Sequence, residues 1–211
     1  MNDKMSELFT RYPVLRVCET SIREAADILL ATYCCGGKIL VCGNGGSCAD
    51  SDHIVGELMK GFLSKRPMRE EEKQCFEKIL GRDSERLTTG LQRGIPAISL
   101  PAQSAVISAF ANDVDADLVY AQLVYGYAKP GDTLIGISTS GNAENVAEAI
   151  KVAKVLGIST IGLTGKTESV LSELCECTIR VPETETFKVQ ELHLPVYHFL
   201  CAWLEQQAFD C

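Results

Sequence analysis

The chain has 211 residues, of which 46% are apolar and 23% are charged, and this balance excludes an intrinsically disordered or low-complexity protein. Its formal net charge is −8, which excludes bulk electrostatic binding to the phosphates of nucleic acid. No apolar run is long enough to cross a membrane, and the first residues lack a secretory apolar core. We therefore expect one cytoplasmic domain over residues 1–211, with neither a nucleic-acid nor a membrane partner.

The apolar and polar residues predict strands that alternate with helices. Helices are expected over residues 3–35, with a break at Pro13, and short buried strands are expected at 38–42, 95–100, 133–137, 159–163 and 177–181. Between and after the strands we expect helices near 47–59, 102–111, 117–127, 141–156, 167–174 and 187–208. This order predicts an α/β fold, a doubly wound five-stranded parallel sheet flanked by helices.

One charged segment, about residues 64–94, interrupts this alternation as an insertion. Apolar residues within it permit one amphipathic helix near 69–80. Such a segment is a solvated surface helix in one interpretation and a lid or a subunit contact in another, and the sequence does not decide between them.

Two polar loops follow predicted strands and begin predicted helices. They are 43–47, with sequence Gly-Asn-Gly-Gly-Ser, and 138–142, with sequence Ser-Thr-Ser-Gly-Asn. Glycines allow a ligand close to the backbone, and the N-terminus of the next helix offers free N–H groups to an anion. Ligands of doubly wound sheets bind beyond the carboxyl ends of the strands. Together the two loops predict a phosphate-binding site.

Acid–base residues accompany these loops. His53 and Glu57 are four residues apart on the helix after the first loop, so they share one face, and His198 lies on the last helix. His193 is expected to be structural or exposed. A carboxylate and an imidazole beside a phosphate site suit aldose–ketose isomerisation, which needs a base, a proton shuttle and a positive charge near the enediolate. A divalent metal held by His53, Glu57 and His198 would supply that charge.

The stretch from Cys42 to Leu58, CGNGGSCADSDHIVGEL, resembles the sugar-isomerase (SIS) domain proteins, and among them the phosphoheptose isomerase family. Three further blocks carry the same resemblance: GISTSGN at 136–142, the Asn112-Asp113 pair, and Gln-Glu-Leu-His at 190–193 followed by His198. The blocks occur in the family's order and cover most of residues 1–211.

The resemblance implies an isomerase that converts sedoheptulose 7-phosphate to glycero-manno-heptose 7-phosphate, with Glu57 as base and His198 as acid. The implied substrate-binding residues are Asn44, Gly45, Gly46, Ser47, Glu57, Asn112, Asp113, Ser138, Thr139, Ser140 and Gln190. The implied zinc ligands, for one Zn²⁺ per site, are His53, Glu57, Gln190 and His198. It also implies a cytoplasmic homotetramer. The alternatives are an isomerase of another sugar phosphate and a non-catalytic SIS protein that binds phosphosugars or a replication initiator.

The implied zinc site raises a geometric question. Gln190 and His198 are eight residues apart, which on a straight helix is a rise of about 12 Å. Either Pro195 kinks or restarts the helix between them, or the ligands come from two chains. We expect the second arrangement, with His53 and Glu57 in one subunit and His198 in its neighbour.

Overall fold

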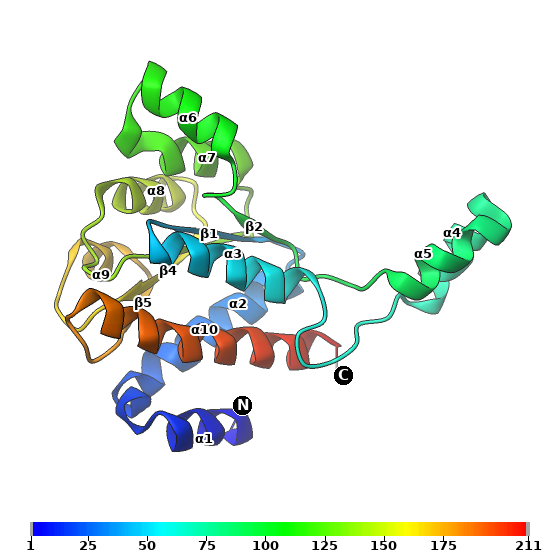
Figure 1. Ribbon diagram of the computed structural model, residues 1–211, viewed down its shortest axis with the longest axis horizontal. Helices are drawn as coiled ribbons and strands as arrows, with labels where there is room; N and C mark the ends of the chain where they lie inside the picture. The colour runs from blue at the N-terminus through cyan, green and yellow to red at the C-terminus, as the bar shows by residue number, and fades with distance from the viewer. Residues whose placement is uncertain (1, 210–211) are drawn as a thin grey trace.

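The five predicted strands form one parallel sheet in the computed structural model, which describes residues 2–209 (Figure 1). The strands are β1 (Ile39–Gly43), β2 (Ala97–Ser99), β3 (Thr133–Ile137), β4 (Ser159–Thr164) and β5 (Cys177–Arg180). Their order in the sheet is β2-β1-β3-β4-β5, and all four pairings are parallel. The predicted α/β fold with a five-stranded parallel sheet is thus confirmed.

Helices cover both faces of the sheet. One face carries α1 (Asn2–Arg11), the 3-10 helix η1 (Pro13–Cys18), α2 (Glu19–Cys34), α3 (Gly46–Met59) and α10 (Thr186–Phe209). The other face carries α7 (Val119–Tyr127), α8 (Glu144–Val155) and α9 (Val170–Leu174), and α6 (Ser104–Asp113) packs beside them. The short 3-10 helix η3 (Ala116–Leu118) directly precedes α7. Within residues 2–209, no helix has the length and apolar character needed to cross a membrane.

The central strands are buried on both sides because successive side chains point to opposite faces. In β1, Ile39 and Val41 belong to the core under α2, α3 and α10, whereas Leu40 and Cys42 belong to the core under α7 and α8. Every residue of β1 and β3 is buried. The continuous apolar runs that predicted these strands are therefore a direct result of their burial between two helical layers.

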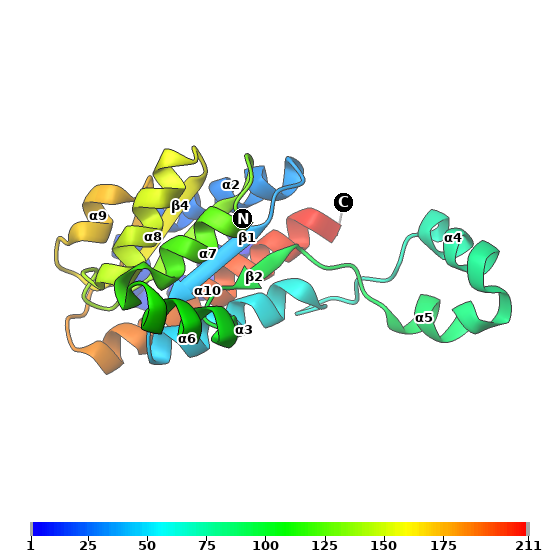
Figure 2. The same ribbon diagram turned by 90° about the horizontal axis from the view of Figure 1, so that it is seen from above.

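The charged insertion forms an arm that extends away from the sheet (Figures 1 and 2). It contains α4 (Glu70–Leu80), the 3-10 helix η2 (Gly81–Ser84) and α5 (Glu85–Gly90), and α4 has no buried residue. An antiparallel bridge between Pro67 and Gln92 joins the two chain segments of its stem. The sequence predicted α4 but not α5, which is only six residues long.

The strand order fixes where a ligand can bind. After β1 the chain adds β2 on one side of it, and then crosses to the other side to add β3, β4 and β5 in turn. The direction in which strands are added therefore reverses between β1 and β3. In sheets of this order the reversal opens a crevice at the carboxyl ends of these two strands. The loops after β1 and β3 are the two polar loops of the sequence.

Candidate functional site

The two polar loops lie next to each other at the carboxyl edge of the sheet. Gly43, the last residue of β1, pairs in register with Ile137, the last residue of β3. The side-chain amides of Asn44 and Asn145 exchange two hydrogen bonds of 2.7 and 3.0 Å, and Asn145 lies at the start of α8. The two loops are therefore neighbours, and Asn44 connects the first loop to the helix after the second.

The loop over residues 138–142 is shaped by its own hydroxyl groups. Ser138 is buried and accepts a hydrogen bond from the backbone N–H of Ala143, while Ser140 accepts one from Asn142. Gly141 has a φ of +70°, a conformation that favours glycine. The loop then enters α8 at Glu144. Thr139 and Ser140 are left partly or fully exposed at the crevice, where an anion can reach them.

The first loop allows close packing of α3 against α10. Gly45 has a φ of +57°, and a Cβ on Gly46 would collide with the side-chain amide of Gln190. Gln190 therefore lies against the loop, as expected for a substrate-binding residue. Ser47 is buried in the first turn of α3, where its backbone N–H donates to Asn44.

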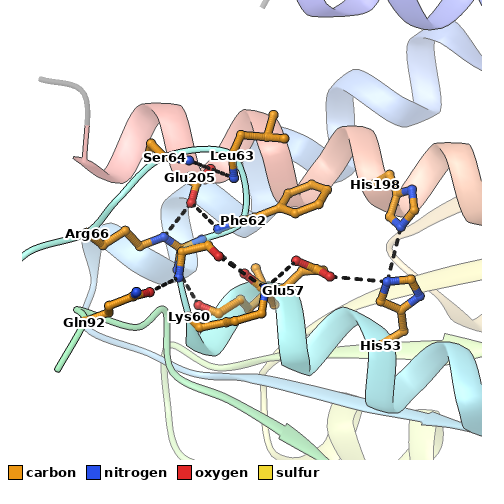
Figure 3. Close-up of polar contacts among 12 residues, drawn as sticks. His53, Glu57, Lys60, Phe62, Leu63, Ser64, Arg66, Gln92, His198 and Glu205 are labelled. Atoms are coloured by element: carbon orange, nitrogen blue, oxygen red, sulfur yellow. Dashed lines mark hydrogen bonds and ion pairs between the residues drawn. The ribbon is translucent and has the colours of Figure 1, made fainter. Parts of the chain in front are cut away.

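Further along α3, three predicted residues meet in one chain (Figure 3). Nε2 of His53 lies 3.3 Å from Oε1 of Glu57 and 3.4 Å from Nε2 of His198. The rings of His53 and His198 pack edge to face, with their centroids 4.9 Å apart. We call His53, Glu57 and His198 the acid–base cluster. It forms because α3 and α10 run side by side in the same direction, so Gly46 meets Gln190 and His53 meets His198.

The expected source of His198 is therefore wrong, because this residue reaches His53 from its own chain. The alternative explanation is a kink or a restart at Pro195. A restart is wrong, because α10 continues through Pro195 from Thr186 to Phe209. Pro195 is buried within this helix, and the core packing of its neighbours Val196 and Tyr197 keeps the helix intact despite the lost hydrogen bond. Along an uninterrupted helix Gln190 lies about 12 Å before His198, and its side-chain amide lies beside Gly46 of the first loop. Its role as a zinc ligand stays a prediction.

The spacing within the cluster suits a metal ion only in part. In residues 2–209 no group of three or more His, Cys, Asp or Glu side chains is arranged to hold a metal ion. The two contacts of His53 Nε2, at 3.3 and 3.4 Å, nevertheless match the distance of about 3.3–3.4 Å between ligands of a tetrahedral ion with metal–ligand bonds of about 2.0–2.1 Å. Two imidazoles and a carboxylate are also a donor set of catalytic zinc sites.

Two residues that sequence reasoning missed lie behind His53. The hydroxyl of Tyr197 is 3.1 Å from Nδ1 of His53 and donates to Oδ1 of Asp50, also at 3.1 Å. Burial raises the pKa of Asp50, although the hydrogen bond from Tyr197 and the nearby His53 oppose that rise. Asp50 precedes His53 by three residues on α3, and this spacing was the signal that could have found it.

A second missed group lies on the other side of Glu57. Nζ of Lys60 is 3.2 Å from Oε2 of Glu57, so the carboxylate has an imidazole near one oxygen and an ammonium near the other (Figure 3). The guanidinium of Arg66 donates to the carbonyl oxygens of Glu57 and Leu58 at the end of α3. The backbone that carries the predicted base is therefore fixed from the stem of the arm.

Three other residues singled out in the sequence, His193, Asn112 and Asp113, make their described contacts outside the cluster. His193 is fully buried, its Nε2 is 3.2 Å from the carbonyl of Thr164, and burial lowers its pKa to about 4. His193 is therefore a structural residue, which was one of the two expected roles.

Asn112 and Asp113 are exposed at the end of α6, and among the described contacts the amide of Asn112 donates only to Asp113. Their predicted contact with substrate stays a prediction.

The environment of His198 favours its neutral form. Burial is the main cause that lowers its pKa, and the neighbouring His53 and Arg11 act in the same direction. Glu57 opposes them. His198 also borders a groove of about 360 Å³ between α1 and α10, whose lining includes Arg11, Phe62 and Leu194. Neutral imidazole in this position can both accept and donate a proton.

Comparisons with known proteins match the chain to one family. Two family models described as SIS domain match the chain, over residues 105–201 and 4–93. The phosphoheptose isomerase of Rhodospirillum rubrum is 35% identical over 89% of this chain and 86% of its own length, and that of Trichlorobacter lovleyi is 36% identical over 89% and 83%.

Solved structures give the same result. The chain resembles phosphoheptose isomerase GmhA from Neisseria gonorrhoeae with a TM-score of 0.74 and 26% identity, over 96% of this chain and 95% of that one. It resembles a phosphoheptose isomerase from Francisella tularensis with a TM-score of 0.76 and 26% identity, over 97% of both chains.

Proposed function

The chain belongs to the phosphoheptose isomerase family of SIS-domain proteins and is an isomerase enzyme, and from this premise we propose that it interconverts sedoheptulose 7-phosphate and glycero-manno-heptose 7-phosphate. The observation that carries this proposal is that Glu57 and His198 both lie beside the imidazole of His53. Glu57 and His53 are on α3, the helix that begins at the first polar loop. A family member that only bound phosphosugars would not need the pair of Glu57 and His198.

The roles follow from the positions of the residues. The hydroxyls of the 138–142 loop and the first turn of α8 bind the phosphate of the substrate. Gly46 and His53 are seven residues apart on α3, a rise of about 10 Å, which is comparable with the length of an extended sugar phosphate. The phosphate bound at the loops therefore leaves the reacting end of the sugar at the acid–base cluster, with Asn44 and Gln190 contacting the carbons between.

The chemistry is a transfer of protons with no net redox change. Glu57 removes a proton from C1 of the ketose, which gives an enediol(ate), and the proton returns to C2. His198 moves a proton between the hydroxyl on C1 and the carbonyl oxygen on C2, so that C1 becomes the aldehyde. Lys60 places a positive charge beside the second oxygen of Glu57, next to the developing negative charge.

For a metal we propose Zn²⁺ held by His53, Glu57 and His198, which the spacing of their donor atoms supports. Zinc would supply positive charge that stabilises the enediolate. Gln190 is better assigned to the substrate, because it packs on Gly46. The two roles of Glu57 are compatible, because Oε1 faces the imidazole of His53 while Oε2 faces Lys60.

We also propose the family's homotetramer and a cytoplasmic location. Exposed Met59 and Leu63, which is 64% exposed, lie beside the site, where a second subunit would cover them. All nine cysteines among the described residues are unpaired, which supports a reducing compartment.

The decisive experiment is turnover of sedoheptulose 7-phosphate by the purified protein in D₂O, followed by NMR. An enediol mechanism predicts aldose product with deuterium at C2, because the proton on the base exchanges with solvent. Other ketose phosphates serve as competing substrates. A protein that binds the phosphosugar without turnover would instead be a non-catalytic SIS protein, and turnover of another ketose phosphate alone would change the substrate.

A further inference from the structure

The two ring nitrogens of His53 contact different groups. Nε2 faces Glu57 and His198 in the acid–base cluster. Nδ1 lies 3.1 Å from the hydroxyl of Tyr197, and that hydroxyl lies 3.1 Å from Oδ1 of Asp50. Asp50, Tyr197 and His53 therefore form a chain of hydrogen bonds that runs from the protein interior to the cluster.

The hydrogen atoms available set the direction of this chain. A carboxylate offers only acceptors, and a tyrosine hydroxyl has one hydrogen to donate. When Tyr197 donates to Asp50, its oxygen is left as an acceptor, and His53 must supply the hydrogen of the second bond from Nδ1. The reverse direction would leave the oxygens of Asp50 and Tyr197 facing each other as two acceptors, and a buried unsatisfied polar group costs about 1–3 kcal/mol.

Packing holds the chain of hydrogen bonds in place. Tyr197 is only 2% exposed, and its ring meets the ring of His53 edge to face at 5.5 Å. Among the described atoms, Oδ2 of Asp50 is buried and has no hydrogen-bond partner. The hydroxyl of Tyr197 is thus the side-chain donor described for this carboxylate, and Asp50 cannot turn toward another donor without losing it.

A neutral His53 with hydrogen on Nδ1 has a bare Nε2. That lone pair faces Oε1 of Glu57 at 3.3 Å and Nε2 of His198 at 3.4 Å. A lone pair beside a carboxylate oxygen is unfavourable unless a proton or a cation lies between them. The orientation of His53 therefore prepares the cluster to accept a proton from His198 or to bind a cation.

We propose that Tyr197 and Asp50 are positioning residues that hold His53 in the Nδ1–H tautomer and present its bare Nε2 to Glu57 and His198. Neither residue touches the substrate, and both act through the imidazole. The consequence for zinc binding rests on the proposed function, whereas the tautomer itself is a property of the protein alone. Outer hydrogen bonds of this kind fix the ring orientation of histidines that bind metals.

The tautomer can be measured directly by NMR on protein labelled with ¹⁵N-histidine at neutral pH. The chain has three histidines, so loss of one signal in His53→Gln assigns the ring. The wild-type protein is expected to show hydrogen on Nδ1 and a bare Nε2. Tyr197→Phe removes the acceptor and should return the ring toward the mixture of free histidine, in which Nε2–H predominates.

Asp50→Leu tests the other end of the chain. Leucine is close to aspartate in shape and cannot accept a hydrogen bond, so the hydroxyl of Tyr197 is expected to donate to Nδ1 of His53 and shift the hydrogen to Nε2. Asp52→Leu is the matched control: Asp52 lies on the same helix and accepts from Ser99 at 2.5 Å, away from His53. Tyr127→Phe, which loses a hydroxyl bonded to Gln103, is the control for the tyrosine.

Zinc affinity gives a second readout that needs no turnover. In competition with a chromogenic chelator, Tyr197→Phe and Asp50→Leu should weaken Zn²⁺ binding by about 10–100-fold, and the two controls should not. Failure of the wild-type protein to bind Zn²⁺ would remove the metal from the proposed function, while the tautomer would still be read by NMR. Hydrogen on Nε2 in the wild-type protein, or an unchanged ring in Tyr197→Phe of native fold, would overturn the inference.

Discussion

Arg66 and Glu205 form an ion pair that is almost completely buried. Nε of Arg66 lies 2.7 Å from Oε1 of Glu205, and the two residues are 1% and 2% exposed. Glu205 also accepts hydrogen bonds from the backbone N–H groups of residues 62–64, while Arg66 donates to the carbonyl oxygens of Glu57 and Leu58. The pair thereby joins α10, the end of α3 and the stem of the arm (Figure 3).

Removing one member of this pair should destabilise the protein strongly. Glu205→Ala leaves the guanidinium and three backbone donors without their partner, and a broken buried pair costs about 3–5 kcal/mol. The free energy of unfolding in urea measures this loss. Arg180 and Glu168, 3.7 Å apart and exposed, provide the control, because Glu168→Ala should cost at most about 1 kcal/mol. Equal losses for the two pairs would contradict the assigned role of burial.

The same pair predicts a dependence of stability on acid. Burial alone would raise the pKa of Glu205, but the backbone N–H groups and Arg66 outweigh it and lower the pKa below its usual 4.5. Because the folded-state value is depressed, the stabilisation is complete above pH 4.5 and is lost as the pH falls through the folded-state pKa. Glu205→Gln should remove this component from a series of urea unfolding curves below pH 5.

His193 adds a second acid-sensitive component at higher pH. Burial lowers its pKa to about 4 from 6.5, so the folded state binds fewer protons than the unfolded state between these values. The stabilisation is complete above pH 6.5 and declines toward pH 4, by about 3 kcal/mol in all. His193→Gln keeps a donor for the carbonyl of Thr164 and should flatten the stability profile between pH 6.5 and 4. An unchanged slope would show that the pKa of His193 is not lowered in the folded protein.

Glu57→Gln should leave a folded protein with greatly reduced turnover. The amide keeps the size of the side chain and its hydrogen-bonding capacity, but it cannot take a proton from carbon. Loss of a general base typically costs about 10²–10⁴ in rate. The rate of isomerisation at saturating phosphosugar measures the effect, with Glu148→Gln as control, because Glu148 pairs with Lys151 on α8. Turnover within a few-fold of wild type would remove Glu57 from the role of base.

The loop over residues 138–142 should govern the affinity for phosphorylated sugars. Thr139→Ala removes one hydroxyl from the proposed phosphate site, and a hydrogen bond to a charged group is worth about 1.5–3 kcal/mol, so KM should rise by about 10–100-fold. Inorganic phosphate should compete with the substrate. Thr89→Ala on the arm is a matched control. Equal turnover of a sugar with and without its phosphate would exclude this loop as a phosphate site.

The fold was predictable from sequence because its signals are local. Each central strand is a short apolar run buried on both faces, and β3 begins and ends at the predicted residues. The loops of the site were found for the same reason, since glycines and hydroxyl residues follow β1 and β3 directly. The 3.6-residue period also found α8 and the face that carries His53 and Glu57.

The contacts that the sequence did not predict join residues far apart in the chain. They depend on how α3 and the arm stem align with α10, and no local sequence pattern contains that information. Tyr197 meets His53 across 144 positions of the chain, and Glu205 meets Arg66 across 139. The continuation of α10 through Pro195 belongs to the same class, because tertiary packing compensates for one lost hydrogen bond. The alignment of α3 with α10 therefore had to be seen before the acid–base cluster could be assigned to one chain.

This assignment predicts the outcome of subunit mixing. Glu57→Gln and His198→Asn chains, carrying different tags, can be expressed together and the mixed oligomers purified through both tags. Because Glu57 and His198 contact the same His53 within one chain, every subunit of a mixed oligomer lacks one of the two groups. The mixed preparation should therefore stay as inactive as either parent, whereas wild-type chains mixed with either variant should contribute activity in proportion to their number. Partial recovery in the mixture of the two variants would show that one subunit supplies Glu57 and another His198 to a shared site.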